Sequence, residues 1–200
     1  MPRRRGASTA PRVLGLGGGA GSGKTTLAEG LVEALSAQVL HLDDFNFQDG
    51  ARGVFVTNAE SGTRHLDLNH PASIDVGRLL AELDRLGQDG GVRTVIVEGH
   101  LALALPGLRA RLDSSLFVDL PIDLCIVRKL VRKVGQGADA AVVARNYRQS
   151  GRPGHLLFVA PSRRHADIVL DGLLEPQELV QAALQQLAAL GLISVTPPPG

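Results

Sequence analysis

GGAGSGKTT, at residues 18–26, contains the complete pattern G-x-x-x-x-G-K-[ST] between Gly18 and Thr25. Glycines let successive backbone N–H groups turn inward around a phosphate, because they have no Cβ atom and tolerate positive φ. The lysine of this pattern reaches the β- and γ-phosphates of a nucleotide, and the hydroxyl that follows it binds Mg²⁺. We therefore expect the whole stretch to bind ATP: Gly18, Gly19, Ala20, Gly21, Ser22, Gly23, Lys24, Thr25 and Thr26.

The residues on either side of this loop have the patterns of a strand and of a helix. Residues 12–16 (RVLGL) form a short apolar run, which is typical of a buried strand. Within residues 27–35, apolar side chains recur at helical spacing. The loop is therefore predicted to lie between a strand and the start of a helix, whose dipole attracts phosphate.

Strands and helices alternate along the rest of the chain. Apolar runs predict strands at 38–42, 94–97, 115–120 and 168–170, and helical spacing predicts helices at 74–86, from 121 onward, at 139–149 and at 177–190. Residues 46–73 have no sustained period, so we expect a long loop there. The alternation favours an α/β fold, the three-layer αβα sandwich of P-loop NTPases with a parallel sheet of about five strands.

The composition excludes several classes of protein. The chain has 200 residues, of which 44% are hydrophobic, 3% are aromatic and one, Cys125, is cysteine. This suits the aliphatic core of one domain, but not a disulfide framework, a cysteine-rich zinc site or rows of base-stacking aromatics. The net charge of +1 argues against nucleic acid as a partner, and the lack of a run of 18 apolar residues argues against a membrane span. The cytoplasm is the expected compartment.

The two ends of the chain differ from its middle. Residues 1–11 are basic and are not followed by the apolar stretch of a secretory leader, so a disordered tail is predicted. Residues 193–200 end in three prolines and a glycine and are predicted to form a second tail. The domain is expected at 12–192. Within it, residues 37–122 are acidic and 121–165 basic, which suits a metal-and-hydroxyl site facing a phosphate clamp; chance patterning of solvated faces is the alternative.

Carboxylates follow two of the predicted strands. Asp43 and Asp44 come after the strand at 38–42, and Glu98 comes after the strand at 94–97. Ligands of parallel sheets bind at the carboxyl ends of the strands. We expect Asp43 to accept the proton of an attacking hydroxyl, Asp44 to lie near the acceptor, and Mg²⁺ to be held by Thr25, Asp43 and Glu98. The alternatives are a helix-capping carboxylate pair and a solvated strand end.

Basic residues gather on the helix predicted from residue 121. Arg128 and Arg132 are one turn apart, with Lys129 beside them. Cations that clamp the transferred phosphate stabilise the charge that develops on it. We expect Arg128 and Arg132 to act in catalysis with Lys24, and Lys129 to bind the nucleotide; a solvated basic face is the alternative. His100 follows a strand end and is expected to contact the acceptor.

Seven segments, taken in order, resemble the uridine kinase and phosphoribulokinase family of P-loop kinases, which includes nicotinamide riboside kinases. They are GGAGSGKTT (18–26), LDDF (42–45), NHPASID (69–75), VIVEG (95–99), LFVDLP (116–121), the helix around 128–132, and PSRRHADIVL (161–170). The resemblance covers residues 13–172 and implies transfer of the γ-phosphate of ATP or GTP to a hydroxyl of a small molecule. It also implies that Asp43 is the base, that Glu98 is the strand-end acid, and that a small helical lid at about 128–152 brings Lys129 and Arg132 to the phosphates. The adenine is expected near residues 162–166.

The chain departs from uridine kinases at three places. Only residues 87–93 stand where uridine kinases carry a β-hairpin that reads the pyrimidine. Asn69 replaces an aspartate that often holds ribose hydroxyls, and residues 137–139 (GAD) replace a frequent Arg-Gly-Arg of the lid. We still expect Asn69 to contact the acceptor, since an amide accepts a hydroxyl hydrogen bond, although less strongly than a carboxylate.

A nucleoside is therefore the expected acceptor of the phosphate. The alternatives are nicotinamide riboside or another metabolite of this kinase family and, second, a non-catalytic ATP-binding regulatory module. A GTPase switch is disfavoured because the chain has no N-K-x-D motif. A homo-oligomer is compatible with the sequence.

Overall fold

The computed structural model of the chain describes residues 11–57 and 62–193. Its main sheet has five parallel strands in the order β2-β5-β1-β6-β7. They are β1 (Arg12–Gly18), β2 (Ala37–His41), β5 (Thr94–Glu98), β6 (Ser114–Asp119) and β7 (Ile168–Asp171). The predicted parallel sheet of about five strands is confirmed, with the first strand of the chain at its centre.

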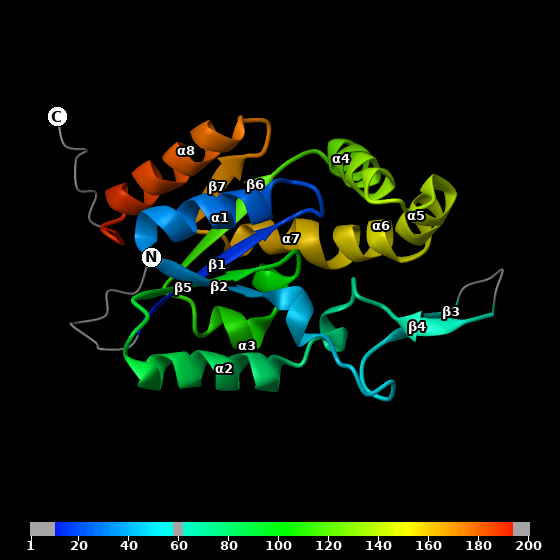
Figure 1. Ribbon diagram of the computed structural model, residues 1–200, viewed down its shortest axis with the longest axis horizontal. Coiled ribbons are helices and arrows are strands. Elements are labelled where there is room, and N and C mark those ends of the chain that lie inside the picture. Colours follow the sequence, from blue (N-terminus) through cyan, green and yellow to red (C-terminus); the bar gives the residue numbers. More distant parts are fainter. Residues whose placement is uncertain (1–10, 58–61, 194–200) are drawn as a thin grey trace.

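Helices cover both faces of this sheet, with α1 and α8 on one face and α2 and α3 on the other (Figure 1). The longer helices are α1 (Lys24–Leu35), α2 (Val76–Asp89), α4 (Ile122–Gly135) and α8 (Pro176–Ala189). The shorter ones are α3 (Pro106–Arg109), α5 (Ala140–Asn146), α6 (Arg152–Gly154) and α7 (Ala160–Ser162). Acidic side chains cap the N-termini of three helices: Asp75 at α2, Asp139 at α5 and Glu175 at α8.

Alternate residues of the strands feed two apolar cores. Val13 and Val95 belong to the core that also contains the leucines of α2, whereas Leu14 and Ile96 belong to the core shared by α1 and α8. Successive side chains of a strand point to opposite faces, so continuous apolar runs are needed where both faces are covered. The predicted three-layer αβα sandwich is therefore confirmed.

Helices α1 and α8 approach most closely at Gly30. A Cβ atom on Gly30 would lie 2.4 Å from Cγ2 of Val180 on α8. Because valine is stiff at χ1 and cannot move aside easily, Gly30→Val is expected to lower the free energy of unfolding by about 1–3 kcal/mol. Urea denaturation measures this change. The double variant Gly30→Val/Val180→Ala should recover part of the loss, and an unchanged midpoint in the single variant would contradict the close approach.

The segment 46–73 is more ordered than the sequence suggests. β3 (Phe55–Thr57) and β4 (Arg64–Leu66) form a two-stranded antiparallel hairpin. The expectation of a loop without strands was therefore wrong. Each strand has only three residues, which is too few for alternation of apolar and polar side chains to be recognised in the sequence. Gln149 joins the hairpin to the helical segment that follows α5, since its Nε2 donates to the carbonyl of Thr57 at 2.6 Å.

The backbone from 140 to 165 is helical throughout, whereas the predicted helix ended at 149. Two π-helical stretches, Tyr147–Gly151 and His155–Val159, separate α5, α6 and α7, and a 3-10 turn at Arg163–His165 follows. Two prolines in this segment predict a break. Each of them follows a π-helical stretch by two residues, in α6 or α7, and the helical path continues past it.

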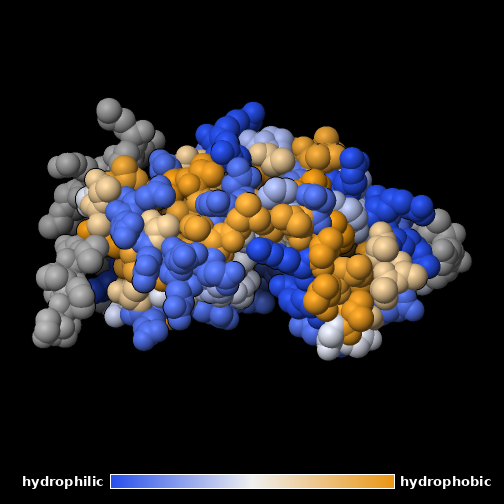
Figure 2. Space-filling view, turned by 90° about the horizontal axis from the view of Figure 1, so that it is seen from above, coloured by the Kyte–Doolittle hydropathy of each residue, from blue (hydrophilic) through white to orange (hydrophobic). Residues whose placement is uncertain are grey.

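Helix α4 is the least covered of the long helices. Cys125 is its one buried residue, and an apolar stripe at 3-4-3 spacing is exposed to solvent. The stripe consists of Leu124, Val127, Val131 and Val134. Figure 2 shows apolar surface over the part of the molecule where α4 lies. Among the described residues, no helix has the length and apolar character required to span a membrane.

Candidate active site

The loop between β1 and α1 depends on glycine for its shape. Gly18, Gly21 and Gly23 have φ angles of +139°, +96° and +103°. A Cβ atom on Gly18 would lie 2.6 Å from the carbonyl oxygen of Val118, and one on Gly21 would lie 2.5 Å from that of Cys125. Only glycine combines these angles with so close an approach to neighbouring backbone. The glycine pattern is thus required by the fold as well as by phosphate binding.

Lys24 is the first residue of α1 and is 6% exposed. Its Nζ donates to the carbonyl of Gly19 at 2.8 Å. Burial lowers the pKa of Lys24, and the nearby Glu98 carboxylate partly opposes that effect. An ammonium has three donor protons, so two remain for other acceptors. A phosphate beside Lys24 would also favour the charged amine.

A cavity of about 470 Å³ opens beside Lys24. It brings the loop together with side chains that follow β2 and β5 and with two side chains of α4. The predicted site residues that line it are Ala20, Gly21, Ser22, Gly23, Lys24, Thr25, Thr26, Asp43, Glu98, His100, Arg128 and Arg132. The predicted residues outside this lining are Gly18, Gly19, Lys129, Asp44 and Asn69.

The remaining wall of this cavity comes from the junction of β7 and α8. Leu174, Pro176 and Leu179 give it an apolar surface suited to a flat ring. None of the residues 162–166, where the adenine was expected, lines the cavity. The junction has no recognisable motif, but its position after a parallel strand was a usable signal, because such strand ends meet at one edge.

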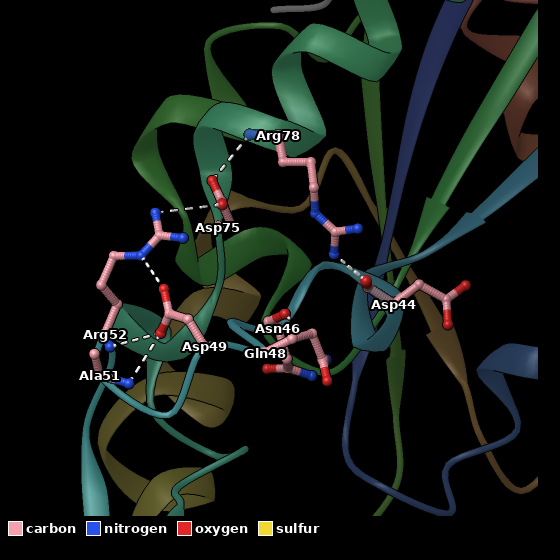
Figure 3. A network of polar contacts seen from close by, with 8 residues as sticks. All are labelled: Asp44, Asn46, Gln48, Asp49, Ala51, Arg52, Asp75 and Arg78. Carbon is pink, nitrogen blue, oxygen red and sulfur yellow. Dashed lines mark hydrogen bonds and ion pairs between the residues drawn. The ribbon is translucent and has the colours of Figure 1, made fainter.

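The backbone around Asp43 is held from both sides. The side-chain amide of Asn46 donates to the carbonyl of Asp43 at 2.8 Å, and the guanidinium of Arg78 donates to the carbonyl of Asp44. Figure 3 shows the second of these contacts within a network that continues to Asp75, the N-cap of α2. The side chain of Asp43 itself is 77% exposed, so a fixed backbone presents an accessible carboxylate to the cavity.

Asp44 lies apart from the other predicted acidic residues. Asp44 borders a separate hollow at the edge of the sheet, together with His41 and Arg78. In Figure 3 the Asp44 carboxylate points away from Arg78, which binds only the main-chain carbonyl. The structure does not bring Asp44 to the cavity, so its role toward the acceptor remains a prediction.

Glu98 ends β5 with a side chain that is 10% exposed. Its Oε2 accepts a hydrogen bond from Nδ1 of His41 at 3.1 Å. His41 and Glu98 are register partners on β2 and β5. Sequence reasoning assigned no role to His41, because the pairing exists only once these two strands, far apart in the chain, lie side by side.

The basic residues of α4 divide between two cavities. Arg128 and Arg132 line the larger one, and Nη1 of Arg128 donates to the carbonyl of Gly172 at 3.0 Å. Lys129 lines a second cavity of about 20 Å³. Burial lowers the pKa of Lys129, and the neighbouring charges of Lys133 and Arg132 add to the effect. The three cations of this helix therefore lie beside two cavities.

His100 borders both cavities. Burial lowers the pKa of His100 to about 4, with a further contribution from Lys24 that Asp43 opposes at an Nδ1–Oδ1 distance of 4.0 Å. Its imidazole is therefore neutral at pH 7. Asn69 lies on the far side of the second cavity, where its Nδ2 donates to Oγ of Ser150 at 2.7 Å.

The oxygen donors of the larger cavity fit a magnesium ion. The hydroxyl of Thr25 and the carboxylates of Asp43 and Glu98 line the same space. Mg²⁺ is a hard cation that proteins hold through one or two carboxylates together with the phosphates of the substrate. Buried Glu98 supplies a carboxylate that faces the loop, which is the chemistry such an ion requires.

Two proteins of similar sequence carry the same activity name. The uridine kinase of Chloroflexus aurantiacus is 32% identical over 190 residues, covering 82% of this chain and 88% of that protein. The uridine kinase of Deinococcus deserti is 31% identical over 194 residues, covering 83% of this chain and 91% of that protein. The chain belongs to the uridine kinase family. The resemblance drawn from its motifs is thereby confirmed.

Solved structures share the fold of this uridine kinase family member. A putative fructose transport system kinase from Silicibacter sp. TM1040 superposes with a TM-score of 0.60 at 19% identity, covering 83% of this chain and 92% of that chain. A sugar kinase from Janibacter sp. HTCC2649 gives 0.53 at 22% identity, covering 92% and 99%. No protein-family profile matches the chain. The uridine kinase relatives support a small-molecule kinase, hence a phosphotransferase.

Proposed function

We propose that the protein transfers the γ-phosphate of ATP to a hydroxyl of a nucleoside. The observation that carries the proposal is a single cavity bordered by Lys24, Asp43, Glu98 and Arg128. Phosphoryl transfer requires little covalent chemistry from an enzyme. Its rate depends on the positioning of the reactants and on stabilisation of the charge on the transferred phosphate. These residues supply both, and the activity named for the relatives supports a nucleoside as the acceptor.

Each of the side chains around the cavity has its own role in the reaction. Lys24 and the backbone N–H groups of the loop hold the β- and γ-phosphates, and Arg128 and Arg132 stabilise the charge on the transferred group. Asp43 accepts the proton of the acceptor hydroxyl as the oxygen attacks phosphorus. We infer that α4 and the helical segment that follows it form the lid, which excludes water from the phosphates when it closes.

Thr25, Asp43 and Glu98 are the residues that would hold Mg²⁺. Bound there, the ion neutralises charge on the β- and γ-phosphates. Chelation of divalent metal by EDTA is therefore expected to abolish ADP release, and excess MgCl₂ should restore it. A coupled ADP assay measures this, and turnover that persists in EDTA would contradict the assignment of these residues.

The acceptor position is supported by His100, which borders both cavities. The smaller cavity, of about 20 Å³, has room for about one water molecule, so a nucleoside would have to enter the larger one. The neutral imidazole of His100 can donate one hydrogen bond to an acceptor hydroxyl there, in the cavity that the Asp43 carboxylate also lines.

One observation favours nicotinamide riboside as a second candidate acceptor. α2 ends at Asp89 and β5 begins at Thr94, so the interval in which uridine kinases carry their pyrimidine-reading hairpin holds only a short turn. The hairpin that this chain does have, β3 with β4, precedes α2 instead. A nucleoside with a different base fits this arrangement.

A panel of acceptors tests the proposal. ADP release from MgATP, and GDP release from MgGTP, would be measured with uridine, cytidine, nicotinamide riboside, pantothenate, ribulose 5-phosphate and glycerate. We expect release from ATP that depends on a nucleoside. Tight ATP binding with no stimulation by any compound would contradict a nucleoside kinase and favour a regulatory ATP-binding module. Stimulation by a non-nucleoside alone would keep the kinase and change its substrate.

A further inference from the structure

His41 is the hydrogen-bond partner of the Glu98 carboxylate. The carboxylate is 10% exposed and borders the nucleotide cavity, whereas the imidazole is 48% exposed. Nδ1 of His41 lies 3.1 Å from Oε2 of Glu98. An ionised carboxylate can only accept, so Nδ1 is the protonated nitrogen of this pair. A half-exposed residue of strand β2 thus contacts a buried residue of strand β5.

The contact with His41 is a single hydrogen bond to the flexible side chain of Glu98. Within residues 11–57 and 62–193, it is the one hydrogen bond that the Glu98 side chain makes. The Lys24 ammonium donates to Gly19, and its effect on Glu98 is the attraction between the two charges. A glutamate side chain has three rotatable bonds. The hydrogen bond from His41 restricts their rotation and so determines which carboxylate oxygen faces the cavity. With Oε2 engaged, Oε1 is the oxygen available to a ligand.

We propose that His41 is a positioning residue, which fixes the Glu98 carboxylate for the Mg²⁺ that accompanies the nucleotide. The inference rests on the proposed function, since it requires a metal at Glu98. Partners that hydrogen-bond to metal-ligating carboxylates orient them, and their loss commonly lowers metal affinity. His41 acts from outside the cavity: it borders the hollow at the sheet edge, with Asp44 and Arg78, and does not line the nucleotide cavity.

Two substitutions separate the hydrogen bond from the bulk of the ring. His41→Leu removes the donor, whereas His41→Asn keeps an N–H donor at the position of Nδ1. Mn²⁺ serves as the probe metal, and its binding to the protein complexed with the non-hydrolysable analogue AMP-PNP is measured by electron paramagnetic resonance, without turnover. We expect His41→Leu to raise the Kd for Mn²⁺ by about 10-fold or more and His41→Asn to retain most of the affinity.

A matched control and a kinetic readout complete the test. His65→Leu, on the exposed strand β4, should leave Mn²⁺ binding unchanged. In turnover, His41→Leu should require more Mg²⁺ for half-maximal rate while the KM for the acceptor stays constant, a split that general loosening of the fold would not produce. Thermal melting and metal-free AMP-PNP binding verify that each variant is folded.

The possible outcomes distinguish the positioning role of His41 from the proposed kinase function on which it rests. Unaltered Mn²⁺ affinity in His41→Leu, with normal binding by the parent protein, would overturn the positioning role and leave the proposed kinase intact. An equal loss in the Leu and Asn variants would overturn the hydrogen bond as the cause. Failure of the parent protein to bind Mn²⁺ with AMP-PNP would instead overturn the proposed function.

Discussion

Replacing Lys24 with alanine is expected to lower kcat/KM by about 10³-fold or more, the largest loss of any single substitution. The Lys24 ammonium is the one cation that lies within the phosphate loop, where its Nζ is bonded to Gly19. Its removal withdraws charge from the transferred phosphate and leaves the Gly19 carbonyl with the Ser22 N–H as its one remaining donor among the described residues. Steady-state ADP release and calorimetric titration with ATP would measure the two parts of the effect.

A second variant at Lys24 separates the loss of its charge from an effect on folding. Lys24→Met fills the same volume without the charge and should lose activity as alanine does. Lys133→Ala, on the exposed end of α4, removes a lysine outside the cavity lining and should retain activity. Turnover by Lys24→Met at the parent rate would exclude this lysine from catalysis.

Asp43→Asn is expected to lower kcat by about 10²–10⁴-fold while ATP binding stays nearly unchanged. The carboxylate lines the cavity on a backbone fixed by Asn46 and Arg78, and an amide of the same shape cannot accept a proton from a hydroxyl. Pre-steady-state measurement of phosphate transfer would place the loss in the chemical step. Turnover at the parent rate would remove Asp43 as the base.

The neighbouring residue supplies the matched control. Asp44→Asn changes the same functional group one position along, but that side chain borders the hollow at the sheet edge. Its main-chain carbonyl, which Arg78 holds, is unaffected by the substitution. A small effect at Asp44 with a large one at Asp43 would show that position, and not acidity in this turn, determines the rate.

The sequence predicts those parts of the fold that obey a local rule. The loop at 18–26 has a fixed pattern, and the strands of the main sheet contain short apolar stretches, so the order of elements follows from periodicity. The helical path from 140 to 165 was missed beyond 149 because proline and glycine indicate a break when π-helical turns are not considered. The hairpin at 55–66 was missed because its strands are short.

For the site, the residues in motifs were easier to predict than those defined by contact. Asp43, Glu98 and Arg128 follow strands or recur on a helix, and the structure gathers them around one cavity. His41 and the apolar wall at Leu174 carry no pattern of their own. They matter because β2 lies beside β5 and because α8 starts at the cavity, and both are facts of tertiary packing.

The order of the strands has a consequence for how the protein is made. The phosphate loop is synthesised before most of the domain, yet β1 lies at the centre of a sheet whose other strands are all synthesised later. The last helix, α8, packs on α1 and its first turn closes the cavity through Pro176 and Leu179. A nascent chain therefore lacks a complete nucleotide site until α8 has been translated. A chain truncated before α8 would carry the motif without the complete site.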